Sequence, residues 1–542
     1  MSSRLPLLVV LAALLVAAGG AAVGAWREAV PQGWLEDGLR RLVLEEFWER
    51  FDVWAAVALA VAGALLLVMR LGGRWRRADG GLGAALAVVA AVGLVRLVAL
   101  ALALRGPGLP NVVLISIDTL RADRLGAYGH TLPTSPTVDR RLAGEGVVFE
   151  RVFSQSPKTT PSHMTMLTSL YPAVHGIELW EGQTAGPVLS PRVDTLAEVL
   201  RNAGYTTAAF TGGAHMHRAR GFSQGFRRYR HDDQLRRSVE WLREKAGRSF
   251  FLFFHTYEVH DPYAPPPEMI PQFDSQYGDG PILDVVRRVR DGGLDGWEHG
   301  HKLFWDAVDP ANPRDVEFVS RLYDAGIRHM DAATLTPLLD ELDALGLSND
   351  TLVVFTSDHG EAFLEHGHFL HGDLHEETLH VPLVLRFPGR IPPGTRVAQR
   401  ARLLDVMPTI LDLVGVAAPP HLQGRSLAAL ARGTAPGDGE DAAVSEFSQR
   451  DRGRLFESLR VGHDVLIRDG DRMELFDLQN DPREQADRSA ADPARVSALR
   501  AALERWRTEC QTLAARFGPR ATDAETPDAQ TLRNLRALGY VE

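Results

Sequence analysis

Apolar positions in this 542-residue chain are concentrated near its beginning, in three long runs separated by polar segments. A helix that crosses a bilayer needs about 20 mostly apolar residues. We therefore expect a membrane anchor with about three transmembrane helices over residues 1–105. The runs are Leu5–Trp26, Val53–Met69 and Leu82–Leu104.

The short loop between the second and third runs carries four arginines, from Arg70 to Arg77. The positive-inside rule places such a loop in the cytoplasm. The third run then delivers the remaining chain outside. We expect a multi-pass protein of the cytoplasmic (inner) membrane that contacts membrane lipids, with its large domain periplasmic or extracellular. Val23-Gly24-Ala25 is a plausible processing site, so a cleaved signal peptide is an alternative for the first run.

Beyond the anchor, short apolar runs rich in Val, Ile and Phe alternate with helical patterns. Runs of this kind are typical of strands buried on both faces, and the alternation predicts an α/β sheet covered by helices on both sides. The expected strands are Val112–Ile117, Thr206–Phe210, Phe250–Phe254, Leu352–Phe355 and Val381–Leu385. The expected helices include Asp194–Asn202, Ser238–Ala246 and Glu317–Leu345.

Breaks in composition divide the remaining chain. Arg432–Asp441 is rich in Gly, Pro and Asp, as loops are, and we place a domain boundary there, between residues 106–435 and 436–542. The second part has short strand-like segments and a helix around Pro493–Phe517, which predicts a small C-terminal α+β subdomain. Pro265–Pro313 is polar, and we expect it to be an insertion near the functional site.

Charge and cysteine content exclude some functions. The formal net charge is −10, whereas nucleic-acid binding usually needs a basic face, so we expect no nucleic-acid partner. Cys510 is the only cysteine. An intramolecular disulfide and a thiolate metal cluster are therefore both excluded.

Candidate metal ligands follow two of the expected strands. Asp118 ends the first strand, and Asp358 with His359 ends another. Ligands gather at the carboxyl ends of strands in open α/β sheets, so these side chains are expected to converge. Two carboxylates and an imidazole suit Zn or Mn, and Ca less well. A single Asp at such a position is commonly a helix cap, but the pair with an adjoining His favours one divalent metal ion.

A candidate nucleophile lies in the segment SPKTTPSH. Pro161 is a good first helical residue and Thr160 a good N-cap, which places Thr159 just before a helix N-terminus that favours anions. A Thr hydroxyl becomes a useful nucleophile only when a metal or a base activates it. Plain capping is the alternative role for this residue.

Histidines are unusually dense after the expected buried strands. Some are suited to act as general acids or as donors to an oxyanion, whereas others, such as His375 and His380, are expected only to pack or cap. The residues are His255 and His260, then His366, His368, His371 and His375.

Taken together, these motifs resemble the sulfatase family of the alkaline-phosphatase superfamily, from Asn111 to Asp487. The similar segments are IDTLRADRLGAYG, TTPSHMTMLTSLYPAVHG, HDPYAPP, TSDHGEAFLEHGHFLHG, EETLHVPLVLRFPG, LLDVMPTILDLVGV, LQGRSL and ELFDLQNDPREQAD. The resemblance implies an alkaline-phosphatase-like mixed sheet sandwiched by helices. It assigns the metal to Asp118, Thr159, Asp358 and His359, catalysis to Thr159, His260 and His371, and substrate binding to His163 and His215.

The chain departs from the family at several positions. Authentic sulfatases have Cys or Ser at the position of Thr159, oxidise it to formylglycine, and follow it with Pro-Ser-Arg, whereas His163 replaces that Arg here. No formylglycine is therefore expected. The lysines expected near Gly213 and at His371 are both absent. In these respects the chain looks like the phosphoethanolamine and glycerol-phosphate transferases.

The leading functional hypothesis is metal-dependent hydrolysis of phosphate- or sulfate-type esters through a covalent Thr159 intermediate. The alternative is a phosphotransferase that moves a phospho-headgroup, such as phosphoethanolamine or glycerol phosphate, onto an envelope glycolipid or polymer. A third hypothesis is a non-catalytic envelope protein on the same scaffold. The expected partner is an ester substrate such as a glycolipid or glycan.

Overall fold

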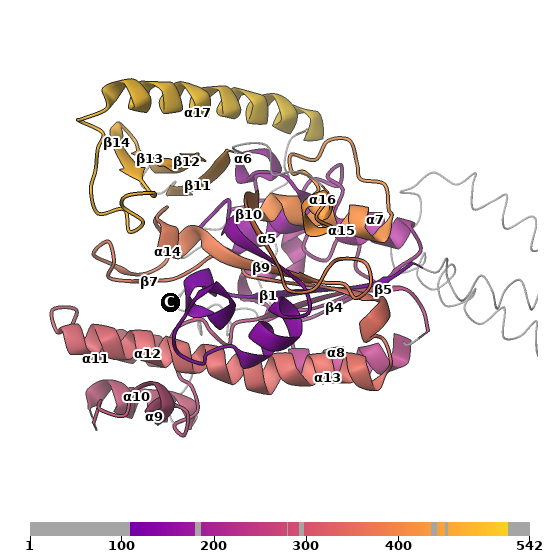
Figure 1. Cartoon of the computed structure of the whole chain (residues 1–542), viewed down its shortest axis with the longest axis horizontal. Coiled ribbons are helices and arrows are strands. Elements are labelled where there is room, and N and C mark those ends of the chain that lie inside the picture. The colour runs from indigo at the N-terminus through magenta and orange to yellow at the C-terminus, as the bar shows by residue number, and fades with distance from the viewer. Residues whose placement is uncertain are drawn as a thin grey trace, which may run out of the picture. The chain divides into compact units, whose positions relative to one another are not determined.

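The computed structural model of the chain (Figure 1) describes residues 109–178, 186–245, 247–278, 280–291, 297–434, 442–449 and 454–518. Its centre is an eight-stranded mixed sheet, in which one strand is antiparallel to both of its neighbours and every other pair of neighbouring strands is parallel. The strand order is β10 (Thr395–Arg402), β2 (Val147–Phe153), β9 (His380–Arg386), β6 (Thr351–Thr356), β1 (Asn111–Ile117), β5 (Phe250–Thr256), β3 (Thr206–Phe210) and β4 (Arg228–Arg230).

The apolar sequence of β1 follows from its central position. Side chains alternate between the two faces of a strand, and in β1 both sets are buried: Val112 and Leu114 enter one core, while Val113 and Ile115 enter the other. A strand covered on both sides therefore needs apolar residues at every position rather than at alternate ones. The predicted mixed α/β fold agrees with this sheet.

Helices cover both faces of the sheet, as Figure 1 shows. One face packs against α8 (Gln234–Lys245), α12 (Pro313–Met330) and α13 (Thr336–Ala344). The opposite face packs against α5 (Thr159–Thr168), α7 (Leu196–Asn202), α15 (Val406–Val414) and α16 (Ala428–Ala431). The remaining α-helices among the described residues are α6 (Pro172–His175), α9 (Ile270–Phe273), α10 (Pro281–Arg290), α11 (Trp297–Ala307), α14 (Glu376–Leu379) and α17 (Pro493–Ala514).

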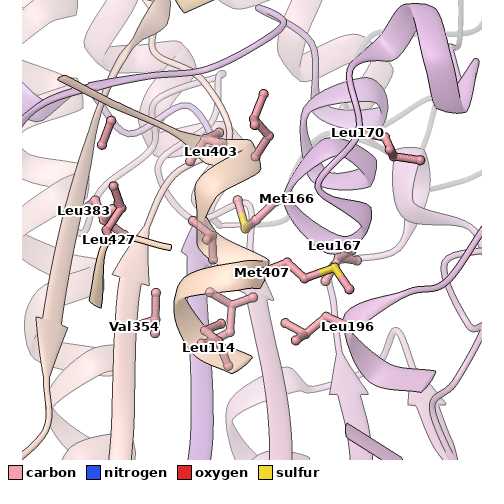
Figure 2. Close-up of a cluster of buried hydrophobic side chains, with 14 of the residues drawn as sticks. Leu114, Met166, Leu167, Leu170, Leu196, Val354, Leu383, Leu403, Met407 and Leu427 are labelled. Atoms are coloured by element: carbon pink, nitrogen blue, oxygen red, sulfur yellow. The ribbon is translucent and has the colours of Figure 1, made fainter. Parts of the chain in front are cut away.

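The core on the α5 side is shown in Figure 2, where Leu114 of β1 and Val354 of β6 face Met407 of α15, with Met166 of α5 beside them. These side chains are fully buried. Since burying such a side chain contributes about 1.5–3 kcal/mol, this layer fixes α5 firmly on the sheet. The N-terminus of α5 is thereby held near the carboxyl ends of β1 and β6.

A second, antiparallel sheet lies under α17, and consists of β11 (Ala443–Gln449), β12 (Arg454–Val461), β13 (Asp464–Asp469) and β14 (Arg472–Asp477). The Glu446 N–H donates to the backbone oxygen of Gln155 (2.9 Å), which joins this sheet to the segment before α5. A short hairpin, β7 (Ala362–Phe363) and β8 (Phe369–Leu370), follows Asp358 in the chain.

Several elements differ from their predicted form. The pattern over Glu317–Leu345 is two helices, α12 and α13, joined by a π-helical turn at Asp331–Leu335. The expected polar insertion, Pro265–Pro313, contains α9, α10 and α11. The strands β2 and β10 were not predicted. The boundaries proposed for the domains stay a prediction.

The expectation of N-terminal transmembrane helices is corrected by the structure. Among the described residues, no helix is both long and apolar enough to cross a membrane; α17 has 22 residues, but arginine and glutamate side chains are spread along it. The runs Leu5–Trp26, Val53–Met69 and Leu82–Leu104, on which the expectation rested, lie outside the described residues. The predictions of a multi-pass inner-membrane location, a periplasmic or extracellular catalytic domain and membrane-lipid partners are therefore not retained.

Candidate active site

The site lies at the carboxyl ends of β1 and β6, which are parallel neighbours with Ser116 opposite Thr356. Asp118 and Asp358 follow these strands, and both are fully buried. The Thr119 N–H donates to Oδ1 of Asp358 (3.2 Å). The backbone that follows β1 therefore holds the carboxylate that follows β6. The structure thus brings together two residues that are 240 positions apart in sequence.

The site residues fit a divalent cation. Ligand atoms of Asp118, Asp358 and His359 all lie within 4.8 Å of one another. Oδ1 of Asp118 and Oδ2 of Asp358 are buried and have no hydrogen-bond partner within the described residues. Burial and the neighbouring Asp358 raise the pKa of Asp118 well above its ordinary value. Two adjacent buried carboxylates are costly unless a cation compensates them, so this arrangement suits a metal ion.

His359 is oriented as a metal ligand would be. Its Nδ1 lies 3.0 Å from the backbone oxygen of Gly360, which can only accept, so Nδ1 carries the proton and Nε2 the lone pair. Burial lowers the pKa of His359 to about 4, which keeps the ring neutral at pH 7. Nε2 lies 3.3 Å from Oδ2 of Asp358. A histidine fixed through its other nitrogen in this way is usual at metal sites.

Thr159 is the first residue of α5, and its hydroxyl faces the candidate metal ligands. The preceding Lys158 is the N-cap and makes no side-chain capping bond, so the expected N-cap position of Thr160 is wrong by two residues. Oγ1 of Thr159 lies 3.4 Å from Nε2 of His359. The Ser162 hydroxyl donates to the backbone oxygen of Asp358 (2.6 Å), which ties the first turn of the helix to the metal-ligand segment.

His163 is fully buried one turn after Thr159. Its Nδ1 donates to the backbone oxygen of Thr159 (2.9 Å), and its Nε2 accepts from the hydroxyl of Ser116 (2.9 Å). Both ring nitrogens therefore bind the protein itself and connect the candidate nucleophile to β1. The substrate-binding role suggested for His163 stays a prediction.

His255 holds Asp118, a role that the sequence did not reveal. The Gly212 N–H donates to Nδ1 of His255 (3.3 Å), so Nε2 carries the proton and donates to Oδ2 of Asp118 (3.1 Å). His255 lies in β5 opposite Ser116 of β1. The sequence signal for this role was the position of His255 at the end of a buried strand. Other histidines also follow buried strands, so this signal did not distinguish His255.

His260 and Asp261 form an ion pair beside the carboxylates. Nδ1 of His260 lies 3.0 Å from Oδ1 of Asp261. Although burial opposes protonation, this hydrogen bond and the charges of Asp261, Asp118 and Glu361 raise the pKa of His260 to about 10. The ring is therefore cationic at neutral pH, as a donor to an anionic substrate or a leaving oxygen needs to be.

Helix α11, which lies in the predicted insertion, supplies two further hydrogen-bond partners of Asp261. Nδ1 of His301 lies 2.6 Å from Oδ2 of Asp261, and Nε1 of Trp305 donates to the same oxygen (3.1 Å). The predicted insertion is thus part of the site. Asp261 is held by groups from two separate segments of the chain.

His371 and His215 lie near the same centre. The His371 ring centroid is 4.4 Å from that of His359 and 5.5 Å from that of His260. Its Nδ1 lies 3.0 Å from Oε1 of Glu361, a residue that was not predicted and whose pKa burial raises to about 8. Nδ1 of His215 lies 3.4 Å from the hydroxyl of Thr160. Their catalytic and substrate-binding roles stay predictions.

A buried nucleophile candidate, paired carboxylates and a cationic histidine at the end of an α/β sheet are typical of metal-dependent ester hydrolases. Residues 110–416 match the family model for sulfatases, and residues 364–509 match the model for the C-terminal part of N-sulphoglucosamine sulphohydrolase. The chain belongs to the sulfatase family, within the alkaline-phosphatase superfamily, and is a sulfuric ester hydrolase.

Curated relatives include arylsulfatase K of Mus musculus, which is 26% identical over 424 residues, covering 69% of this chain and 75% of the relative. N-acetylglucosamine-6-O-sulfatase of Bacteroides thetaiotaomicron is 22% identical over 463 residues, covering 69% of this chain and 82% of the relative. Both are named as sulfatases, which agrees with the predicted hydrolase class. Neither is named as a transferase.

Solved structures share the fold. One is a protein in complex with its substrate D-glucosamine-2-N,6-O-disulfate, which is 19% identical, with a TM-score of 0.60, covering 76% of this chain and 99% of that one. Another is the phosphonate monoester hydrolase of Agrobacterium radiobacter, which is 23% identical, with a TM-score of 0.57, covering 75% and 96%. Likeness at this identity establishes the fold alone.

Proposed function

We propose that this sulfatase-family hydrolase cleaves sulfate esters of a glycan through a covalent ester on Thr159. The observation that carries the proposal is the position of the Thr159 hydroxyl, 3.4 Å from Nε2 of His359. Thr159 is the first residue of α5, and the N-cap of this helix is Lys158 rather than Thr159. A glycan substrate is supported by the relative that is named N-acetylglucosamine-6-O-sulfatase.

In the first step, Oγ1 of Thr159 bonds to sulfur while the bond from sulfur to the glycan oxygen breaks. The cationic His260 gives its proton to the departing oxygen, and the Thr159 proton passes to water. In the second step, water attacks the same sulfur and gives a proton to His260. The Thr159 oxygen leaves as the alkoxide and regains a proton from solvent, releasing sulfate. Splitting one difficult displacement into two is the advantage of a covalent route.

Asp118, Asp358 and His359 would hold a divalent metal ion, with Thr159 in contact with it. Zn or Mn suits this mixed oxygen and nitrogen set, and Ca suits it less well. Bound there, the ion would polarise the ester and favour the ionised hydroxyl. His371, whose ring lies beside that of His359, is the candidate donor to a non-bridging oxygen of the substrate. His215 is a further candidate on the Thr160 side.

We propose that the Thr159 hydroxyl acts unmodified. The oxidation that produces formylglycine starts from Cys or Ser in this family, and the side chain here is that of Thr, without the Arg at position 163. Intact-mass analysis of the peptide that contains residues 158–163 tests this directly. An unchanged Thr159 mass supports the proposal, and an oxidised residue at 159 contradicts it.

Variants of Thr159 test the covalent mechanism. Thr159→Ala should lower kcat by several orders of magnitude with little change in melting temperature, because it removes the attacking oxygen, whereas Thr159→Ser should retain part of the activity. Thr168→Ala is the matched control, since this buried hydroxyl of the same helix donates to the backbone oxygen of Met164. Near-normal turnover of Thr159→Ala would end the mechanism, as would the absence of a sulfuryl adduct on Thr159 after acid quenching of a slow substrate.

A further inference from the structure

Lys158 precedes Thr159, and its side chain crosses from the start of α5 to the segment after β8. Its Nζ donates to the backbone oxygen of His371 (3.1 Å). An ideal Cβ on Gly372, whose φ of +152° favours glycine, would lie 3.7 Å from the same Nζ. The ammonium group is therefore packed beside position 371 without a side chain at 372 to cover it.

Lys158 lies close to the candidate metal ligands. Its Nζ contacts the backbone of His371, and the buried His371 ring has its centroid 4.4 Å from that of His359 and 5.5 Å from that of His260. The residue that follows Lys158 is Thr159, the candidate nucleophile. Both ends of the Lys158 side chain are therefore next to residues of the site.

An anionic substrate needs such a cation. The proposed metal ion carries two charges, which the carboxylates of Asp118 and Asp358 offset. A sulfate ester brings a further negative charge, and so far only His260 has been identified to balance it. Lys158 places an ammonium group next to His371, whose ring centroid lies 5.5 Å from that of His260.

We propose that Lys158 binds a non-bridging oxygen of the ester that is cleaved at Thr159, and so determines the affinity of the site for tetrahedral oxyanions. This inference rests on the proposed function, since it assumes that the ester lies at Thr159. A non-bridging oxygen is chosen because Lys158 adjoins the nucleophile, whereas the leaving oxygen of an in-line displacement lies on the opposite side. Lys158 then increases the rate of cleavage by the same factor for esters with good and with poor leaving groups.

The test compares Lys158→Met, which removes the charge at similar length, with Lys158→Arg, which keeps it. For a series of aryl sulfates, Lys158→Met should lower kcat/KM by about 100-fold, as expected for a group that stabilises transition-state charge, and by the same factor for each leaving group. Lys158→Arg should recover at least about tenfold of that loss. Lys302→Met is the matched control, because Lys302 is 74% exposed and paired with Asp306.

Binding of inorganic sulfate gives a second readout that needs no turnover. In the Thr159→Ala background, titration calorimetry should show a Kd for sulfate about tenfold higher after Lys158→Met, a difference of about 1.4 kcal/mol. Wild-type kcat/KM and sulfate affinity in Lys158→Met would overturn the inference, while an inactive Thr159→Ala leaves the covalent mechanism standing. A loss that grows with leaving-group pKa would also overturn it, by placing Lys158 at the leaving oxygen. If Lys158→Met fails to fold, Lys158→Gln is measured instead.

Discussion

Nε2 of His255 donates a hydrogen bond to Oδ2 of Asp118 over 3.1 Å, and the Gly212 N–H fixes the proton on that nitrogen. Oδ1 of Asp118 takes no part in this bond and has no hydrogen-bond partner among the described residues. His255 therefore orients the carboxylate without binding the metal ion itself. Outer groups of this kind are important for metal affinity.

We expect His255→Ala to weaken binding of Zn or Mn by about 10- to 100-fold, because the Asp118 carboxylate loses its orientation. Competition with a chromophoric chelator measures the change. His421→Ala is the control, since His421 pairs with Asp194. Unchanged affinity in His255→Ala would show that the hydrogen bond has no role in metal binding.

Asp358→Asn should abolish the stabilisation that a bound metal ion gives. The amide oxygen can still accept from the Thr119 N–H, but the negative charge that would hold the cation is removed. Added Mn should raise the melting temperature of the wild type only. A variant that keeps stoichiometric metal, measured by elemental analysis, would contradict the ligand assignment.

The pKa of His260, about 10, predicts how activity depends on alkaline pH. A raised pKa keeps the imidazole protonated through neutral pH, so kcat should fall as pH rises through about 10. His260→Gln should lower kcat by about 10²- to 10⁴-fold, as is typical for loss of a general acid, and should lose this alkaline limb. An unchanged alkaline limb in the variant would exclude His260 as its origin.

Glu446 of β11 predicts a separate effect of pH on stability. Burial raises its pKa from 4.5 to about 8, with a further contribution from the charge of Glu178. Above pH 4.5 the unfolded chain loses this proton while the folded chain keeps it, so Glu446 lowers stability progressively up to about pH 8. Glu446→Gln can still accept from the Ala173 N–H, and it should leave stability unchanged near pH 4 and raise it by roughly 4 kcal/mol at pH 8.

Urea denaturation at the two pH values measures this difference. The control is Glu504→Gln, whose carboxylate is 56% exposed and should give the wild-type result at both. Equal stability of Glu446→Gln and the wild type at pH 8 would show that Glu446 is ionised in the folded protein.

The sequence predicted best where one local pattern determined the structure. The strand that precedes Asp358 is apolar from Leu352 to Phe355 because both of its faces are buried, and this pattern was sufficient to predict it. By contrast, β2 includes Glu150 and Arg151, whose partly exposed side chains interrupt the run, and β10 is paired on one side only. Such strands are defined by their neighbours rather than by their own composition.

The candidate site shows the same limit. Asp118 and Asp358 were recognisable because each follows an apolar strand. The roles of His255 and Lys158 depend on contacts with residues more than 100 positions away, which no local pattern encodes. The start of α5 was misplaced because Thr160-Pro161 is a good capping sequence, whereas the helix begins at Thr159 with Lys158 as its N-cap.

The contacts of α11 with Asp261 have a consequence for engineering. An inserted helix beside a site would ordinarily be the first segment to exchange when a new substrate preference is wanted. Here the exchange would also remove His301 and Trp305 from Asp261, the partner of His260. A chimaera that changes recognition through this segment would therefore also change proton donation, unless a histidine and an indole are rebuilt at the same two places.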